Sequence, residues 1–380
     1  MLNRIYIHIP FCRHKCPYCA FVSRDGQEQH IAGYVKTLLQ EMLLAAGSGK
    51  PFRPLDSIYF GGGTPSLLSP AQVTSILDNA NRLFSISGNT EITLETNPGT
   101  VNADKLAGFK RSGINRLSLG VQSFDDRMLA ALGRIHSAQQ ALDAFSAARD
   151  AGFDNIGIDL IHALPGQTMA MWQSDLQQAT SLNPEHISVY GLTIEEDTPF
   201  ATRYNNENLL PDDNASADMF ETAHTMLTAA GYEHYEIANY ARPGRYSQHN
   251  SGYWQRDGYL GLGAGAHSFL LDSAWGTRFS NSADIDAYCA ALSSGELPRQ
   301  DMHPLSLQDA MAEYLFLGLR MADGVSYRRF GELFSVGLDQ VYGKEIDKLT
   351  ALGLLVQSGD SLRLSLRGML LSNQVFSEFI

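Results

Sequence analysis

Residues 4–19 read RIYIHIPFCRHKCPYC, a β-rich run that leads directly into three closely spaced cysteines. The composition of Arg4–Ile9 predicts a strand. Cys12, Cys16 and Cys19 follow it in a C-x3-C-x2-C loop. Such a loop can place three thiolates on three irons of a cubane cluster, which leaves the fourth iron open to an added ligand. The stretch therefore predicts a [4Fe–4S] site directly after the first strand.

The spacing of the cysteines favours a metal site over a disulfide framework, because three of the four are clustered and the fourth is distant. A structural zinc site that adds His8 or His14 remains an alternative. Zinc sites, however, usually show paired C-x2-C spacings or ligands that return later in the chain. The remaining cysteine, Cys289, lies in the helical pattern AYCAAL, and we interpret it as a small apolar core residue.

Further β-rich runs alternate with helical patterns through the first half of the chain. The expected strands after the first are Ser57–Phe60, Glu91–Glu95, Arg116–Gly120, Asn155–Ile161 and His186–Leu192. Helical spacing or capping residues mark His30–Leu44 and the segments that open at Ser69-Pro70, Ser137 and Thr168. This alternation predicts an α/β fold with a parallel sheet, arranged as a partial (β/α)6 barrel. In such folds a ligand binds at the carboxyl ends of the strands.

Polar and glycine residues stand at or near those expected strand ends. Gly61-Gly62-Gly63-Thr64 follows the second strand, and its bare backbone could approach a ligand closely. Glu95 ends the third strand, and Gln122 follows the fourth. Asp159 lies inside the apolar fifth strand, where a buried carboxylate needs a partner, for which we consider Arg134 or a ligand hydroxyl. Four such positions on consecutive strands favour a binding site.

The pattern changes after about residue 200. A helix is expected over Asp212–Ala230, followed by a stretch rich in Gly, Tyr and Asn. Helices are then expected over Leu305–Met321, Tyr327–Leu333 and Val341–Leu352, with a small hairpin around 358–360. We expect three parts: the barrel (1–235), a connecting segment (236–300) and a mostly helical, winged-helix-like domain (301–380).

Composition narrows the class of protein. The formal net charge of −13 disfavours nucleic acid as a partner, because an acidic surface repels phosphates. No run of eighteen apolar residues is present, and MLNRIYIHIPFC lacks the features of a signal peptide. We therefore expect a cytoplasmic protein. Because the net charge is acidic, we expect the C-terminal part to serve for packing or as a lid and not to bind DNA.

The motifs together resemble the coproporphyrinogen dehydrogenase-like branch of the radical S-adenosylmethionine (SAM) superfamily. They are YIHIPFC-x3-C-x2-C, GGGTPS, ETNPG, RLSLGVQSF, GRIH and IDLIHALPGQT, and they span much of the chain. The resemblance implies that SAM fills the open iron of the cluster with its amino and carboxylate groups. By the same resemblance, the cluster-bound SAM is lined by Tyr6, Gly62 and Glu95. An adjacent site, which holds a second SAM in the dehydrogenase, is lined by Gly63, Thr64, Gln122, Arg134 and Asp159.

Two members of this branch are alternatives. The oxygen-independent coproporphyrinogen III dehydrogenase resembles C-x3-C-x2-C-x-C with a long preceding arm, whereas here Phe21 replaces the fourth cysteine and Cys12 comes almost at once. The string HNSGYW from His249 to Trp254 instead resembles HemW-type haem chaperones. That resemblance implies binding of a [4Fe–4S] cluster, SAM and haem. The implied partners are an electron donor such as flavodoxin or ferredoxin and a haem acceptor that is possibly associated with a membrane. Whether the protein is also an enzyme is left open.

The residues of this string suit haem chemically. His249 offers an imidazole for axial iron coordination, and Tyr253 and Trp254 offer flat faces for a porphyrin. The glycine-rich run 258–268 allows a close backbone approach. The alternative is that His249 and Trp254 are packed structural residues.

Overall fold

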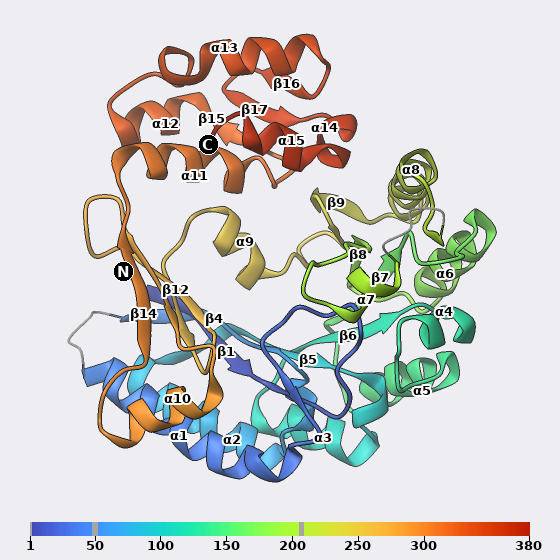
Figure 1. Cartoon of the computed structure of the whole chain (residues 1–380), viewed down its shortest axis with the longest axis vertical. Coiled ribbons are helices and arrows are strands. Elements are labelled where there is room, and N and C mark those ends of the chain that lie inside the picture. Colours follow the sequence, from blue (N-terminus) through green and yellow to red (C-terminus); the bar gives the residue numbers. More distant parts are fainter. Residues whose placement is uncertain (1, 48–51, 205–208) are drawn as a thin grey trace.

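The computed structural model describes residues 2–47, 52–204 and 209–380, and its centre is a parallel sheet (Figure 1). The parallel strands are β1 (Leu2–Ile9), β4 (Phe52–Gly62), β5 (Ile86–Thr96), β6 (Arg116–Gln122), β7 (Ile156–His162) and β8 (His186–Gly191). Each pairs in parallel with the next. The helices between them are α1 (Ile31–Gly47), α2 (Pro70–Phe84), α3 (Ala103–Ser112), α4 (Asp126–Ala131), α5 (Ala138–Asp150) and α6 (Met169–Ser181). The expected partial barrel is therefore confirmed.

Several of these helices begin where the sequence predicts. The Ser69 hydroxyl accepts from the backbone N–H of Gln72, whose side chain accepts from Ser69 N–H, and the same capping box joins Ser137 and Gln140. Each capping box provides acceptors for backbone N–H groups that have no partner within the helix at its N-terminus. Thr168 caps α6 in the simpler way.

The two faces of the parallel sheet differ in chemistry. Side chains on the outer face are apolar and pack under the helices, as Ile5, Ile7, Phe60, Leu94, Leu117, Leu119, Ile158, Leu160 and Val189 do. Removing each of these side chains from water contributes about 1.5–3 kcal/mol. Side chains on the inner face are largely polar and line a cavity, as Tyr59, Glu95, Arg116, Ser118, Asp159, His186, Ser188 and Tyr190 do. The sheet therefore encloses a binding space in place of a filled core.

The sheet continues beyond both of its parallel edges. Past β1 come β11 (Tyr259–Leu262), β12 (His267–Leu270), β13 (Thr277–Asn281) and β14 (Arg299–Pro304), and past β8 come β10 (Asn239–Ala241) and β9 (Glu233–Glu236). The helix α9 (Gln248–Trp254) links β10 to β11, so it crosses from one edge to the other. These strands were not predicted, because each has only three to six residues, which is too short for a clear period-two alternation.

A buried carboxylate on α1 holds the added strands beside β1. Glu41 accepts hydrogen bonds from the Gly263 N–H at 2.7 Å, the Tyr288 hydroxyl at 2.6 Å and the Asn281 amide at 2.6 Å. Burial raises the pKa of Glu41 to about 7. Tyr288 belongs to α10 (Ile285–Ser293), where Cys289 is partly buried against the main core.

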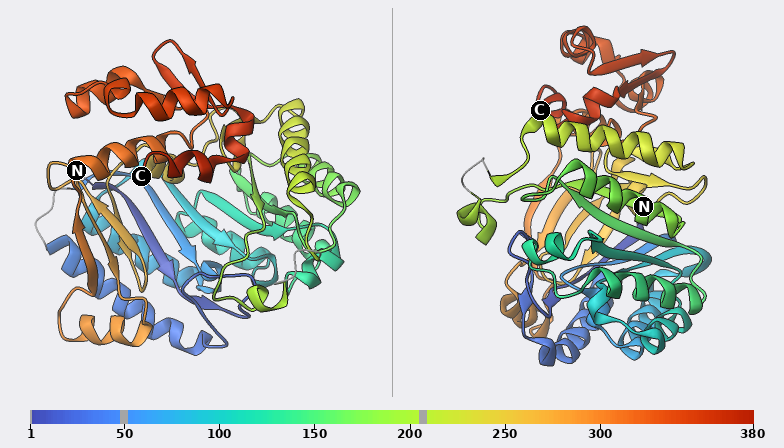
Figure 2. Two further views of the ribbon diagram at one scale, coloured as in Figure 1. Left: turned by 45° about the horizontal axis from the view of Figure 1, so that its top comes forward. Right: turned by 90° about the vertical axis from the view of Figure 1, so that its right-hand side faces the viewer.

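The C-terminal part is helical, as expected, with its own hydrophobic core. It contains α11 (Leu307–Gly318), α12 (Tyr327–Phe334), α13 (Leu338–Ala351), the hairpin β16 (Leu355–Ser358) and β17 (Ser361–Leu364), α14 (Leu366–Leu370) and α15 (Ser372–Ser377). This part lies on the side of the sheet where α9 stands, away from α1 and α2 (Figures 1 and 2). Glu313 of α11 joins it to the strand region through ion pairs with Arg256 at 2.7 Å and Arg278 at 2.5 Å. Among the described residues, no helix combines the length and apolarity needed to cross a membrane.

Candidate functional site

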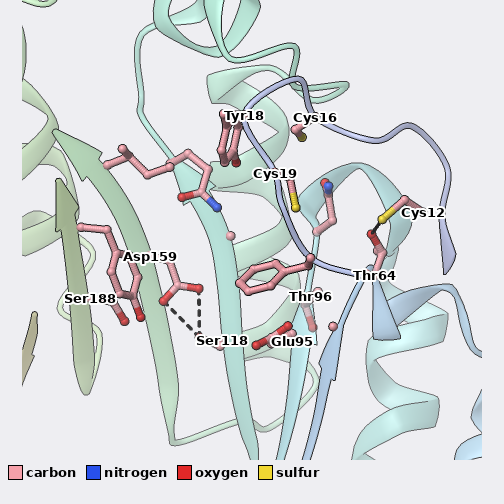
Figure 3. Close-up of a pocket in the computed structure, with 18 of the residues that line it drawn as sticks. Cys12, Cys16, Tyr18, Cys19, Thr64, Glu95, Thr96, Ser118, Asp159 and Ser188 are labelled. Carbon is pink, nitrogen blue, oxygen red and sulfur yellow. Dashed lines mark hydrogen bonds between the residues drawn. The ribbon is translucent and has the colours of Figure 1, made fainter. Parts of the chain in front are cut away.

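A cavity of about 480 Å³ opens at the carboxyl ends of the parallel strands, under the loop that carries the cysteines (Figure 3). Cys12, Cys16 and Cys19 all line this cavity. The Thr64 hydroxyl lies 3.6 Å from Cys12 Sγ, and Arg134 Nη1 lies 3.6 Å from Cys16 Sγ. Both groups can donate to a thiolate. The sequence therefore brings the three thiols to one site, where a donor that follows β4 and a donor that follows α4 face the sulfurs.

The thiols fit a polynuclear cluster better than a single ion. All three are free, and no group of three His, Cys, Asp or Glu side chains in the described residues surrounds one metal position. His8 is not available as a zinc ligand, because its Nε2 lies 2.8 Å from the Val22 carbonyl and its Nδ1 lies 3.0 Å from the Tyr6 hydroxyl. A cubane carries its three thiolates on separate irons and so spaces them more widely than one ion would.

Burial shapes the chemistry of the thiols. It raises the pKa of both Cys12 and Cys19. A thiol with a raised pKa stays protonated and unreactive until a metal displaces its proton. The site therefore suits metal ligands better than nucleophiles.

The glycine run packs directly against the cysteine segment. Gly63 N–H donates to the Ile9 carbonyl at 2.9 Å, and a Cβ on Gly63 would lie 2.7 Å from the Phe11 carbonyl oxygen and 3.0 Å from Cys12 Sγ. Gly62 has a φ of +109°, and a Cβ there would meet the His8 ring. Glycine is required at both positions, because no side chain fits between the run and the loop that it supports.

A partly buried carboxylate stands beneath the cysteine loop. Glu95 accepts a hydrogen bond from the Tyr59 hydroxyl at 2.9 Å. Burial raises the pKa of Glu95 to about 7, although the bond from Tyr59 opposes that rise. At this pKa, a cationic ligand group such as an ammonium would favour the ionised form of Glu95.

The second carboxylate, Asp159, has a different partner from the one expected. The Ser118 hydroxyl lies 3.1 Å and 3.0 Å from the two Asp159 oxygens (Figure 3). Arg134 instead donates to the Gly120 carbonyl at 2.8 Å and faces Cys16. The expectation of an Arg134–Asp159 pair is therefore wrong for the described structure. Both side chains nevertheless line the cavity, as does Gln122, whose φ of +71° is strained for a residue with a side chain.

Most of the predicted site residues come together, and several more were missed. The cavity is lined by Gly62, Gly63, Thr64, Glu95, Gln122, Arg134 and Asp159, whereas Tyr6 stacks behind Tyr59 with ring centroids 6.2 Å apart. The lining residues that the sequence interpretation missed include Tyr59, Arg116, Ser118, His186, Ser188 and Tyr190, all on the inner face of the sheet. They share one signal, which is a polar residue at every second position of an otherwise apolar strand.

The predicted haem residues lie on α9, whose Asn250 lines the cavity. The His249 ring is buried, with Nδ1 2.8 Å from the Ser57 hydroxyl and Nε2 2.7 Å from the Tyr253 hydroxyl. Trp254 lies on the other side, where the Arg320 guanidinium of the C-terminal part stands 4.3 Å from its ring centroid. The three residues therefore do not share one open surface. The run 258–268 forms the β11–β12 turn, where a Cβ on Gly261 would collide with the His267 carbonyl.

Two family models match the chain. Residues 6–179 match the model of the radical SAM superfamily, and residues 305–371 match the model of the HemN C-terminal domain. The structure is similar to that of coproporphyrinogen III oxidase (HemN) from Escherichia coli, with a TM-score of 0.86 at 23% identity. That likeness covers 99% of this chain and 89% of the other, and at such identity it shows the fold.

The sequence relatives are more informative. The chain is 38% identical to the heme chaperone HemW of Bacillus subtilis, over 100% of this chain and 99% of that protein. It is 45% identical to the heme chaperone HemW of Escherichia coli over 69% of each chain. It is 33% identical to a mitochondrial radical S-adenosyl methionine domain-containing protein of Danio rerio, over 98% of this chain and 85% of that protein.

Proposed function

Because this chain belongs to the HemW family of the radical SAM superfamily, we propose that it is a haem chaperone that passes haem to an acceptor protein. It holds a [4Fe–4S] cluster, SAM and haem. The observation that carries the proposal is the meeting of the three thiols, Glu95 and the glycine run at one cavity.

The cluster ligands are Cys12, Cys16 and Cys19. SAM lies beside Gly62 and Glu95 near Tyr6, and the adjacent part of the cavity is lined by Gly63, Thr64, Gln122, Arg134 and Asp159. Support comes from the donor set, since three thiols without a fourth protein ligand leave one iron for an exogenous ligand. Glu95 offers the charge that SAM's ammonium needs, and the bare glycine backbone allows SAM to approach.

When bound, the cluster and SAM supply one-electron reductive cleavage of a carbon–sulfur bond. The protein's own residues provide position and charge. Arg134 and Thr64 direct N–H and O–H donors at two of the sulfurs. Tyr59 keeps Glu95 aimed into the cavity.

Haem would contact the α9 segment, with His249 as the residue that holds its iron. Because the three side chains do not share one open surface, Tyr253 and Trp254 would reach the porphyrin only after α9 rearranges. Burial holds the pKa of His249 well below its usual range, so its imidazole is neutral, as a metal ligand must be. Its Nε2 is engaged by the Tyr253 hydroxyl, so iron coordination requires that hydroxyl to move away. The position next to the C-terminal part suits hand-over of haem to another protein.

The cluster needs an electron from outside the chain. We propose a small redox protein such as flavodoxin or ferredoxin as the donor. The proposed haem acceptor is a second protein, and membrane-associated proteins are among the candidates.

The test starts with anaerobically purified, cluster-loaded protein and its absorbance spectrum before and after added haem. A new Soret band, followed by loss of that haem to an apo-haem protein, supports the proposal. The same preparation is assayed with coproporphyrinogen III, and its oxidative decarboxylation would replace the chaperone with the dehydrogenase.

Two variants test the axial ligand. Tyr253→Phe removes the hydroxyl that occupies Nε2, so it should bind haem more tightly than wild type, while His249→Ala should lose the Soret shift that marks histidine ligation. An unchanged Soret band in His249→Ala would remove His249 as the ligand and leave the chaperone function to be judged by transfer alone.

A further inference from the structure

The amino-terminal end of the barrel interior contains a niche that the SAM assignment does not use. Gly157 of β7 lies two residues before Asp159, so it faces the same interior. A Cβ on Gly157 would lie 3.5 Å from His186 Nδ1 and 3.6 Å from Arg116 Nη2. The same Cβ would lie 3.5 Å from the Leu117 carbonyl oxygen, so the missing side chain leaves a space the size of a methyl group between the two nitrogens.

Arg116 brings a buried positive charge to this niche without a bound counter-ion. Its side chain is almost fully buried, yet its one hydrogen bond in the described structure is a long one, from Nη1 to the Thr93 hydroxyl at 3.5 Å. Its Nε is buried without a partner, and no carboxylate of the described chain lies within ion-pair distance. A buried guanidinium in this state favours an added anion.

The nearby carboxylates are already engaged. Glu91 and Asp159 both act on the charge of Arg116. Glu91, however, accepts the Gln248 and His249 N–H groups at the start of α9, each at 3.1 Å. Asp159 is bonded to Ser118, and burial raises its pKa, which weakens its negative charge. Neither carboxylate fills the niche.

His186 supplies a second donor. Its Nε2 lies 2.9 Å from the Tyr235 hydroxyl, which also accepts the Ser247 N–H at 3.3 Å. Tyr235 therefore directs its own proton to Nε2, and the neutral imidazole carries its proton on Nδ1. That nitrogen is buried and has no hydrogen-bond partner in the described structure.

From these contacts we infer that the niche between Arg116 and His186 binds a carboxylate group of the ligand that occupies the cavity. Both residues line the same cavity as the cysteines, so a ligand can reach from the cluster loop to this end. The carboxylate accepts from the Arg116 guanidinium and from His186 Nδ1–H. The inference rests on the proposed function for its ligands, since a haem propionate and the carboxylate of a second SAM offer the same chemistry.

Gly157→Ala is the main test, because its methyl group would fill the niche at ordinary contact distances. The φ of Gly157 is not positive, so alanine causes no backbone strain and the variant should fold. Arg116→Met removes the charge and is a second variant. Gly33→Ala, at an exposed position of α1 with open space around it, is the matched control.

Each variant, loaded with its cluster, is titrated with two pairs of ligands. The pairs are haem with haem dimethyl ester, and SAM with decarboxylated SAM. For each pair we compare the affinity for the carboxylate-bearing ligand with the affinity for its carboxylate-free form. In Gly157→Ala this ratio should fall about tenfold for the pair whose carboxylate occupies the niche. In Gly33→Ala it should stay at the wild-type value.

The two pairs separate the sources of the carboxylate. A fall confined to the haem pair assigns the niche to a propionate, and a fall confined to the SAM pair assigns it to the amino acid end of SAM. Unchanged ratios in both pairs, for both Gly157→Ala and Arg116→Met, would overturn the inference even where haem binds well. Wild-type protein that binds no haem would contradict the proposed function instead, while the SAM pair would still decide the niche.

Discussion

The Tyr59 hydroxyl donates to a Glu95 carboxylate oxygen at 2.9 Å inside the cavity, and both side chains are partly buried. The bond joins β4 to β5 on their inner face. It keeps a carboxylate, with its pKa raised to about 7, aimed at the place proposed for SAM. The pair therefore trades stability for ligand binding.

Glu95→Gln should make the ligand-free protein more stable above neutral pH. In the folded chain the pKa of Glu95 rises from 4.5 to about 7, so the folded state favours the protonated form. The free energy of unfolding of the wild-type protein therefore falls as the pH rises from 4.5 to 7, by about 3 kcal/mol at pH 8. Denaturant unfolding should show the variant's advantage growing over that range and then levelling.

The same variant should bind SAM about tenfold more weakly at pH 8, because the ammonium loses its anionic partner. Equal SAM affinity in the two proteins would contradict the assignment of Glu95. A difference in unfolding free energy between Glu95→Gln and wild type that does not change with pH would contradict the raised pKa of Glu95.

Gly63→Ala should displace the cysteine loop. Its Cβ would lie 2.7 Å from the Phe11 carbonyl oxygen, so the backbone must shift, at a cost of about 1–3 kcal/mol. Gly33→Ala on α1 meets nothing and should stabilise by about 0.5–1 kcal/mol. Thermal unfolding and iron content measure both effects. Full iron loading in Gly63→Ala would show that the glycine run does not support the loop.

Cys12→Ala, Cys16→Ala or Cys19→Ala should each abolish the visible sulfur-to-iron absorbance of the cluster, since a cubane with two protein thiolates is poorly held. Cys289→Ala should retain about four irons per chain, because this thiol lies on α10 against the main core. Iron and sulfide analysis after anaerobic reconstitution measures how much cluster each variant holds. A complete cluster in Cys16→Ala would refute the ligand set.

Glu313→Ala should loosen the C-terminal part. It leaves Arg256 and Arg278 without their shared carboxylate, which is largely buried, and such a loss costs about 3–5 kcal/mol. Lys348→Ala breaks the exposed pair with Glu378 and should cost at most about 1 kcal/mol. The two variants are compared by their free energies of unfolding in urea and by their rates of limited proteolysis in the segment that precedes α11. Equal losses would show that the Glu313 pairs carry no special weight.

The sequence predicted the parallel strands and the cysteine loop because each carries a local signal. The C-x3-C-x2-C motif follows β1 closely in the sequence. Ser69 and Ser137 are N-cap residues that predict the helices after them. The partner of Asp159 was mispredicted, because Ser118 lies on a neighbouring strand and only the register brings the two together. Register depends on tertiary packing, which no local pattern encodes.

The environment of His249 was equally beyond the sequence. Ser57 and Tyr253 occupy its two ring nitrogens, and Ser57 is distant in the chain. A histidine in a motif shows which chemistry it can offer, and its neighbours decide whether that chemistry is free.

The helix α9 lies against the inner face of β4 and β5, at the end of the barrel opposite the cysteines. It is tied to β5 by the bonds from Gln248 and His249 to Glu91, and to β4 by the bond between His249 and Ser57. Because Asn250 lines the cavity, this short helix also forms part of the cavity wall. A single residue inserted before Asn250 would turn that side chain by about 100° around the helix axis and so reshape the cavity from the end opposite the cysteines, without touching any group that contacts the cluster.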